Sequence, residues 1–361
     1  MGELRLMKGN EVIAEAAIRC GCDGYFGYPI TPQSEIMETL MEREPWNETG
    51  MVVLQAESEV ASVHMLYGAA GSGKKVMTSS SSPGISLMAE GISYLAGAEL
   101  PCLIVNVQRG GPGLGTIQPS QADYWQSTKG GGHGDYRLIV LAPSSVQEMN
   151  DFVELGFQLA FKYRNPAMIL TDGVIGQMME KVVLSDYIPR LTDEEMEEKY
   201  GSWITSGRKN GRKSHVITSL ELDSGRMEQN NIRFQNKYTK MEEEEVLYEE
   251  IQCEDAEYLI VAFGSSARIC QKAVDVARAK GIKVGLLRPI TLFPFPKKPI
   301  AALAQKVKGM LVVEMNAGQM VEDVQLAAKC SIPVIYYGRL GGIVPSPGEV
   351  VEALEQKLIG G

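Results

Sequence analysis

A hydroxyl and two prolines lie between an apolar run and an amphipathic segment near the N-terminus. Gly24–Gly27 has the composition of a short strand, and the residues from Ile36 onward have helical spacing. Pro32 fits the first position of a helix, because the N–H that proline lacks has no partner there. Thr31 is then predicted at the N-cap, beside free backbone N–H groups. Such a helix end can bind a carboxylate or phosphate; the alternative is that Thr31 only caps its helix.

Two glutamates, Glu57 and Glu59, open the next helical stretch, which runs to about residue 70. A carboxylic acid that is partly buried has a raised pKa and can transfer protons near neutral pH. Residues two apart on a helix point about 200° apart, so only one of the two can face a ligand. The alternative is that both acids only stabilise the N-terminus of the helix.

Arg109 follows an apolar strand and opens a glycine-rich loop over residues 110–115. Glycines let the backbone approach a ligand closely, and an arginine can bind a carboxylate through two hydrogen bonds. The loop follows the carboxyl end of a strand, where α/β proteins place their ligands. Without further information, a surface arginine on a turn explains Arg109 equally well. Gln121 and Asp123 follow closely and could orient this loop or contact a partner chain.

Hydroxyls also gather at residues 79–84, where a predicted strand ends and a helix begins. Ser81 and Ser82 could cap this helix, contact a cofactor or shape a substrate pocket. A second glycine-rich turn, residues 130–134, contains His133. A histidine can act as an acid or base, but a lone histidine in a loop is usually not catalytic.

Residues 68–75 match most of the phosphate-binding pattern G-x-x-x-x-G-K. The last position of that pattern requires Ser or Thr for Mg²⁺, whereas this chain has Lys75. The segment also follows a helical pattern and precedes a strand, which reverses the required order. We therefore predict a helix C-terminus and a turn, which argues against an ATP-dependent enzyme.

The composition is that of a globular protein that can hold two domains. The 361 residues include 44% hydrophobic and 22% charged residues, with a net charge of −10. This acidic balance argues against nucleic acid as a partner. No apolar run is long enough to span a membrane and no secretory signal is evident, so a cytoplasmic location is expected. The six cysteines lack the spacing of an iron–sulfur site and are expected to be reduced and mostly buried.

Strands and helices alternate over residues 1–185, which predicts a parallel sheet covered on both faces. Residues 186–255 are charged and poor in apolar residues, and are expected to form a solvated connecting segment with some extended structure. A second alternating pattern over residues 256–361 predicts a smaller α/β domain. Its prolines between residues 289 and 299 predict a rigid loop.

Several segments together resemble the alpha subunit of 2-oxoacid:ferredoxin oxidoreductases, most closely the branched-chain 3-methyl-2-oxobutanoate (2-ketoisovalerate) type. They are G-Y-P-I-T-P at residues 27–32, Q-A-E-S-E at 55–59, S-S-S-S-P-G at 79–84, Q-R-G-G-P-G at 108–113 and E-M-N-A-G-Q at 314–319. The resemblance implies a pyrimidine-type thiamine-diphosphate-binding domain over residues 1–185. It also implies that residues 256–361 resemble the C-terminal domain of transketolase.

The resemblance also implies roles for particular residues. The catalytic glutamate of the family lies nine residues before a Gly-Ala pair, here Gly68-Ala69, which selects Glu59 as the acid against N1′ of the aminopyrimidine. Thr31 and Arg109 would bind the carboxylate of the 2-oxoacid. The remaining cofactor contacts would come from Pro29, Ile30, Ser81 and Ser82.

One motif of thiamine enzymes is absent: G-D-G followed by asparagine, which holds Mg²⁺ and the diphosphate. No metal ligand is therefore expected in this chain, and a beta subunit would supply the diphosphate side. A gamma subunit and a ferredoxin-like iron–sulfur subunit would complete the complex, with the clusters on partner chains. The reaction implied is oxidative decarboxylation of a 2-oxoacid with CoA to acyl-CoA and CO₂, with ferredoxin as electron acceptor. Alternatives are a 2-oxoglutarate-specific enzyme and a non-catalytic scaffold subunit.

Overall fold

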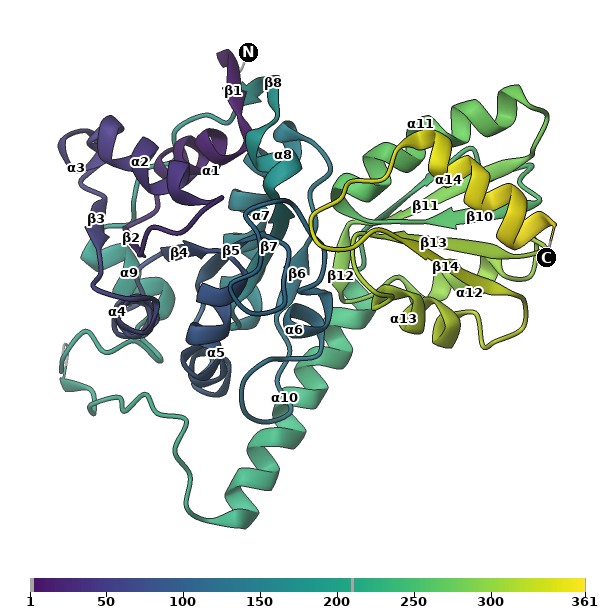
Figure 1. Ribbon diagram of the computed structural model, residues 1–361. Coiled ribbons are helices and arrows are strands. Elements are labelled where there is room, and N and C mark those ends of the chain that lie inside the picture. The colour runs from purple at the N-terminus through teal and green to yellow at the C-terminus, as the bar shows by residue number, and fades with distance from the viewer. Residues whose placement is uncertain (1–2, 209–210, 361) are drawn as a thin grey trace.

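The computed structural model describes residues 3–208 and 211–360 (Figure 1). It consists of two α/β lobes: the larger contains the N-terminal elements, and the smaller contains most of the C-terminal third of the chain. Lys209 and Asn210, which belong to the charged run around residues 208–213, lie outside the described residues.

A seven-stranded sheet in the order β12-β6-β7-β5-β4-β2-β3 forms the centre of the larger lobe. All its pairs are parallel except β12–β6. Every residue of β4, β5 and β7 is buried, as expected for strands covered on both faces. The strands are β2 (Gly24–Gly27), β3 (Val52–Gln55), β4 (Val76–Ser80), β5 (Leu103–Gln108), β6 (Ile139–Leu141), β7 (Ala167–Asp172) and β12 (Thr291–Phe293). The predicted α/β class and parallel sheet are confirmed.

Helices cover this sheet in two groups, in which α1, α2 and α7 pack together and α4 packs on α5. Right-handed crossovers place these groups on opposite faces. Because α2, α4 and α5 each follow the carboxyl end of a parallel strand, their N-termini meet at one edge of the sheet. The helices are α1 (Gly9–Arg19), α2 (Ser34–Arg43), α3 (Pro45–Glu48), α4 (Glu59–Gly71), α5 (Ser82–Gly97), α6 (Tyr124–Thr128), α7 (Val146–Tyr163) and α8 (Gly173–Gln177).

The smaller lobe is a five-stranded sheet in the order β14-β13-β10-β11-β9, in which β9 is antiparallel to β11. Helix α11 packs on α14, and α12 packs on α13. The strands are β9 (Tyr248–Ile251), β10 (Tyr258–Val261), β11 (Val284–Pro289), β13 (Met310–Glu314) and β14 (Val334–Gly338). The helices are α11 (Gly264–Ala279), α12 (Lys297–Leu303), α13 (Met320–Ala327), α14 (Pro347–Ala353) and a π-helical end over Leu354–Ile359.

The connecting segment contains two helices that the sequence pattern did not predict, α9 (Asp193–Tyr200) and the long diagonal α10 (Ser224–Glu244) in Figure 1. Helix α10 is anchored by Phe234, Tyr238 and Met241, which are buried at helical spacing. Most of its other residues are polar, so this narrow apolar stripe was hidden in the sequence.

The proline-rich segment after β11 also differs from the expected rigid loop. It contains β12, which leaves the smaller lobe and pairs with β6 in the sheet of the larger lobe. A strand at a sheet edge tolerates neighbouring prolines, because only one side of it needs hydrogen-bond donors. The two lobes are therefore joined by backbone hydrogen bonds.

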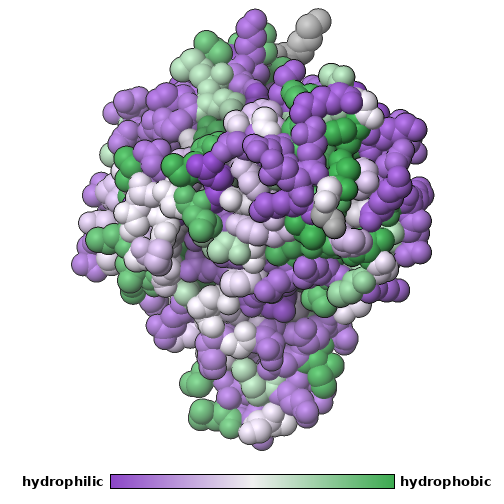
Figure 2. All heavy atoms as spheres, turned by 45° about the vertical axis from the view of Figure 1, so that its right-hand side comes forward, coloured by the Kyte–Doolittle hydropathy of each residue, from purple (hydrophilic) through white to green (hydrophobic). Residues whose placement is uncertain are grey.

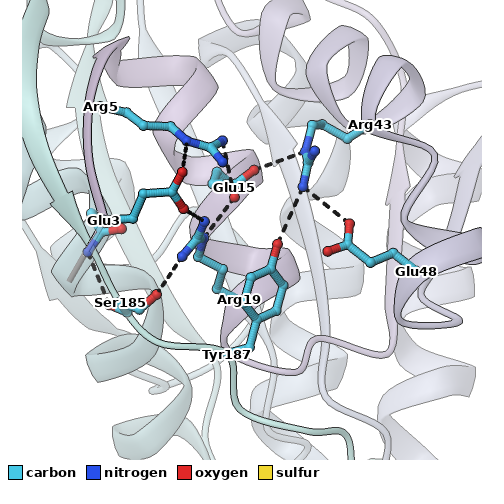
Figure 3. Close-up of polar contacts among 9 residues, drawn as sticks. Glu3, Arg5, Glu15, Arg19, Arg43, Glu48, Ser185 and Tyr187 are labelled. Atoms are coloured by element: carbon cyan, nitrogen blue, oxygen red, sulfur yellow. Dashed lines mark hydrogen bonds and ion pairs between the residues drawn. The ribbon is translucent and has the colours of Figure 1, made fainter. Parts of the chain in front are cut away.

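A two-stranded antiparallel sheet forms the top of the larger lobe in Figure 1: β1 (Glu3–Lys8) and β8 (Met179–Leu184). Close to it, Glu15 of α1 is 1% exposed and accepts hydrogen bonds from Arg19 Nε at 2.7 Å and Arg43 Nε at 3.0 Å (Figure 3). Arg5 Nη1 lies 3.7 Å from the same carboxylate, and Arg19 also pairs with Glu3. This ion-pair cluster ties β1, α1 and α2 together.

Candidate active site

Glu59 is the first residue of α4, and the hydroxyl of the preceding N-cap, Ser58, accepts the Ala61 N–H at 3.2 Å. The Glu59 side chain is 7% exposed, whereas Glu57 is exposed and accepts a hydrogen bond from the Ser58 hydroxyl at 3.1 Å. Within residues 3–208 and 211–360, no hydrogen bond or ion pair reaches the Glu59 carboxylate. A carboxylate on a buried side chain that has no partner in the protein is available to a ligand.

Two serine hydroxyls at the end of β4 are also buried without a partner in the part of the chain that the structure describes. They are Ser80 Oγ and Ser81 Oγ. Ser81 is the N-cap of α5 but makes no side-chain cap hydrogen bond, so capping does not explain its hydroxyl. A Cβ at Gly84 would lie 2.8 Å from Glu59 Oε1 and 2.0 Å from Ser80 Oγ. Glycine at this position therefore allows α5 to approach both groups.

Thr31 lies on the turn between β2 and α2 and is exposed. The prediction that Thr31 caps a helix is wrong, because α2 begins at Ser34. The Gln33 N–H donates to the Ile30 carbonyl at 3.0 Å, which closes a turn before the helix begins. The Thr31–Pro32 peptide bond in this turn is cis. The other predicted cofactor contacts from this segment, Pro29 and Ile30, lie on the same turn, exposed and half-buried respectively.

Gln33, which was not selected from the sequence, holds this turn from the protein interior. Its fully buried amide donates from Nε2 to the Tyr28 carbonyl at 3.0 Å and accepts from Ser79 Oγ at 2.6 Å. Asn10 of α1 donates to the Pro32 carbonyl at 2.8 Å. Nothing in the sequence distinguishes these amides from surface residues, because their role depends on burial between distant elements.

The guanidinium of Arg109 connects the Thr31 turn to the glycine-rich loop. Its Nη1 donates to the Thr31 carbonyl at 3.0 Å, and its Nη2 donates to the Leu114 carbonyl at 2.9 Å. The Nε of Arg109 is buried without a partner among the described residues. The structure therefore brings Thr31 and Arg109 together, and each terminal nitrogen retains a further N–H for a ligand.

Ser82 and Asp123 fix the start of the same loop. Ser82 Oγ donates to Asp123 Oδ2 at 2.6 Å and accepts the Arg109 backbone N–H at 3.0 Å. Asn106 Nδ2 donates to the same Asp123 oxygen at 2.9 Å, and burial raises the pKa of Asp123. The hydroxyl of Ser82 is thus already committed within the chain, whereas that of its neighbour Ser81 is free. Of the two roles left open for Asp123, orienting the loop fits these contacts.

Gln121 joins the segment after the Arg109 loop to the smaller lobe. Its buried Nε2 donates to the Phe263 carbonyl at 2.8 Å, and its Oε1 accepts from Ser266 Oγ at 2.6 Å and from the Met315 N–H at 3.1 Å. Asn316 returns a hydrogen bond to the Gln121 carbonyl at 2.8 Å. The E-M-N-A-G-Q segment is therefore part of a joint between the lobes, and the Gln121 side chain is not available to another chain.

The other residues considered from the sequence lie apart from Glu59 or lack suitable geometry. His133 is exposed on its loop. The phosphate-loop-like segment is the end of α4 followed by a turn into β4, as predicted. Among the described residues, no group of three or more His, Cys, Asp and Glu side chains could hold a metal ion. All six cysteines are free, and only Cys330 is exposed.

Comparison with known families identifies the architecture. The family model described as pyruvate flavodoxin/ferredoxin oxidoreductase, thiamine diphosphate-binding, matches residues 15–250. This chain belongs to that oxidoreductase family. A second model, pyruvate:ferredoxin oxidoreductase core domain II, matches residues 256–350. Within the part of this oxidoreductase that the structure describes, no helix is long and apolar enough to cross a membrane.

Relatives of this oxidoreductase subunit include the ketoisovalerate oxidoreductase subunits VorB of Methanothermobacter thermautotrophicus and Methanothermobacter marburgensis. The first is 49% identical over 98% of this chain and 97% of the relative, and the second is 51% identical over 94% and 93%. The 2-oxoglutarate synthase subunit KorA of Methanocaldococcus jannaschii is 37% identical over 98% of this chain and 99% of the relative.

A solved structure of 2-oxoglutarate:ferredoxin oxidoreductase from Magnetococcus marinus superposes with a TM-score of 0.85 at 28% identity. The match covers 98% of this chain and 65% of that chain, and that structure holds 2-oxoglutarate, coenzyme A and succinyl-CoA. A split-gene transketolase, at 13% identity, covers 98% of each chain with a TM-score of 0.60, which shows similarity of fold alone.

Proposed function

We propose that this chain is the catalytic alpha subunit of a thiamine-diphosphate-dependent 2-oxoacid:ferredoxin oxidoreductase that uses CoA. The observation that carries the proposal is the uncommitted carboxylate of Glu59, on a buried side chain close to the free hydroxyl of Ser80, with the free hydroxyl of Ser81 next in the chain. An aminopyrimidine carries ring nitrogens and an amino group, which require both an acid and hydroxyl partners. The buried groups present at this edge of the sheet fit that requirement.

The cofactor, when bound, supplies a carbon nucleophile for the 2-oxo group and accepts electrons as CO₂ leaves. Glu59 would hold and transfer a proton at N1′, which is effective from a buried position. Arg109 and the Thr31 turn would hold the substrate carboxylate with the N–H groups that remain free. Gln33 would keep the turn, and Ser82 and Asp123 the loop, in the arrangement that carboxylate binding requires.

The surface around Glu59 supports a site shared with another subunit. Exposed apolar side chains lie on β3, α4 and α5, the elements around it, with Val52 50%, Val60 43% and Leu87 57% exposed. Exposed hydrophobic patches of this kind mark interaction sites. We propose that a beta subunit covers this surface and supplies the Mg²⁺ and diphosphate ligands. The gamma subunit, the iron–sulfur subunit that reduces ferredoxin, and the cytoplasmic location remain predictions.

The sequence identity to relatives with different substrates bears on which 2-oxoacid this chain uses. The two VorB relatives are 49% and 51% identical to this chain, and four archaeal KorA relatives are 34–37% identical. A ketoisovalerate subunit VorA and a mycobacterial KorA are each 28% identical. We therefore propose 3-methyl-2-oxobutanoate or a related branched-chain 2-oxoacid as substrate, with 2-oxoglutarate as the alternative.

Turnover of the reconstituted complex on a panel of 2-oxoacids, with CoA and oxidised ferredoxin, tests this proposal. We expect the highest kcat/KM for branched-chain substrates. A preference for 2-oxoglutarate would contradict the substrate assignment alone. Full activity after Glu59→Gln would instead favour the scaffold hypothesis, in which this chain only holds partners together.

A further inference from the structure

Residues 215–222, between α9 and α10, form an extended segment that belongs to no sheet (Figure 1). Exposure alternates along it, and the even-numbered positions point to solvent, with Val216 83%, Leu220 70% and Leu222 86% exposed. The odd-numbered positions are half-buried. A period of two with apolar side chains on one face is typical of a β-strand.

The inward side of this segment crosses the C-terminal ends of α4 and α5. Ile217 Cδ1 lies 3.6 Å from the position a Cβ would have at Gly71, and Ser219 Cβ lies 3.1 Å from that position at Gly97. Both glycines are the last residues of their helices. The segment is therefore seated against the larger lobe through Ile217 and Ser219, with Val216, Leu220 and Leu222 turned outward.

The backbone of this segment is free to pair. Among the described residues, none of its N–H or C=O groups makes a hydrogen bond with another backbone group. The Leu220 N–H bonds only to the Thr218 hydroxyl, at 3.0 Å. An extended segment with free donors and acceptors can accept a further strand from another chain.

A hollow of about 1100 Å³ lies under the segment, between the ends of α4 and α5 and the start of α10. Aromatic side chains line it, namely Tyr67, Tyr94, Tyr136, Trp203 and Phe234. Figure 2 shows hydrophobic residues on the narrow lower end of the molecule, where Figure 1 places the start of α10. The hollow can receive side chains of a strand that pairs with the segment.

We propose that residues 215–222 are an edge strand that pairs with an extended, alternately apolar segment of the subunit that completes the Glu59 site. This inference rests on the proposed function. Exposed apolar side chains occur on α4 and α5 between the two places: Val60, Met65, Leu87 and Tyr94. Ser82 and Tyr94 are about 18 Å apart along α5, at 1.5 Å per residue, and one standard interface spans that distance. A second copy is a poorer occupant, because two chains of net charge −10 repel each other.

Hydrogen–deuterium exchange of the full chain, alone and in the purified complex, tests this inference. We expect the amides of residues 215–222 to exchange rapidly in the isolated chain and slowly in the complex. Protection of residues 60–65 without protection of residues 215–222 would overturn the inference and leave the shared active site intact. Protection that grows with the concentration of the isolated chain would also overturn it, because it would identify a second copy as the partner. Absence of protection at both places would contradict the shared site as well.

A variant pair gives a second readout. Leu220→Asp combined with Leu222→Asp should weaken binding of the partner subunit about tenfold or more, because carboxylates replace apolar side chains that the pairing would cover. Leu326→Asp is the matched control, because Leu326 is 73% exposed on α13 of the smaller lobe. Equal affinity of the double variant and the control would contradict the pairing.

Discussion

Two buried glutamates in the larger lobe differ in whether their carboxylates have partners within the chain. Glu15 is 1% exposed and is surrounded by Arg5, Arg19 and Arg43 (Figure 3). Glu59 is 7% exposed, and within the described residues no cation or hydrogen-bond donor reaches its carboxylate. Both lie on helices of the same lobe, so the difference is not one of general environment. A carboxylate that stabilises the fold is neutralised by its neighbours, whereas one that serves a ligand is left free.

The same distinction separates the hydroxyls near Glu59. Ser79 and Ser82 are committed to partners within the chain, at 2.6 Å each to Gln33 and Asp123. Ser80 and Ser81, between them in the sequence, have no partner among the described residues. The hydroxyls with partners position the Thr31 turn and the Arg109 loop, and we propose that the free hydroxyls contact the ligand.

The largest effect on stability is expected at Glu15. Glu15→Ala leaves Arg19, which is 4% exposed, without its main buried partner, and should lower the free energy of unfolding by about 3–5 kcal/mol. Urea denaturation measures this loss. Glu48→Ala is the control, because its pair with Arg43 is exposed and should contribute less than about 1 kcal/mol. Similar losses in both variants would show that the Glu15 cluster is not a special stabilising element.

Glu59→Gln should give the opposite result, with stability kept and chemistry lost. The exchange rate of the C2 hydrogen of thiamine diphosphate in the assembled complex should fall about 10²-fold or more, because an amide cannot transfer the proton. Nuclear magnetic resonance of quenched samples measures this rate. Glu57→Gln, which alters an exposed acid two residues earlier, should have little effect. A larger effect of Glu57→Gln would reverse the assignment.

Arg109→Lys should affect the substrate more than the cofactor. Lysine keeps the charge but lacks the planar guanidinium. That group can contact the Thr31 and Leu114 carbonyls and a substrate carboxylate at the same time. We expect a loss of about 1–3 kcal/mol in kcat/KM for the 2-oxoacid, at nearly unchanged affinity for thiamine diphosphate. Thr31→Val should act in the same direction more weakly, and it should not lower the melting temperature, since Thr31 caps no helix. Equal losses in substrate and cofactor binding after Arg109→Lys would contradict the carboxylate role.

The smallest effect on stability is expected at Ser81. Removal of its unpartnered hydroxyl in Ser81→Ala should change the free energy of unfolding by less than about 0.5 kcal/mol and weaken cofactor binding. Ser79→Ala removes a hydroxyl that is bonded to Gln33 and Tyr25 and should cost about 1–2 kcal/mol. Thermal unfolding of both variants, with cofactor titrations of the complex, checks the pair. A large loss of stability in Ser81→Ala would mean that its hydroxyl has a structural role.

The parallel sheet was predictable because its strands contain apolar runs, such as residues 167–170, between helical patterns. The choice of Glu59 over Glu57 needed the family resemblance, because periodicity did not separate them. The structure adds that Glu59 is buried and Glu57 exposed. Helix α10 was missed because three buried residues anchor a helix that is otherwise polar.

The start of α2 was misplaced because Pro32 fits both a helix and a turn. The hydrogen bond from Gln33 to Ile30 selects the turn, and the buried Gln33 amide reinforces it. The roles of Gln121 and Asp123 could not be predicted, because they depend on contacts between residues far apart in the chain. Sequence patterns report local structure, whereas these contacts are tertiary.

Calorimetric titration with thiamine diphosphate and Mg²⁺ tests the central claim, that this chain provides the pyrimidine side of a divided site. The isolated chain should bind the cofactor poorly, because the described residues offer no group of acidic, histidine or cysteine side chains for a metal. The complex with its beta subunit should bind it tightly in the presence of Mg²⁺. Tight, Mg²⁺-dependent binding by this chain alone would contradict the account.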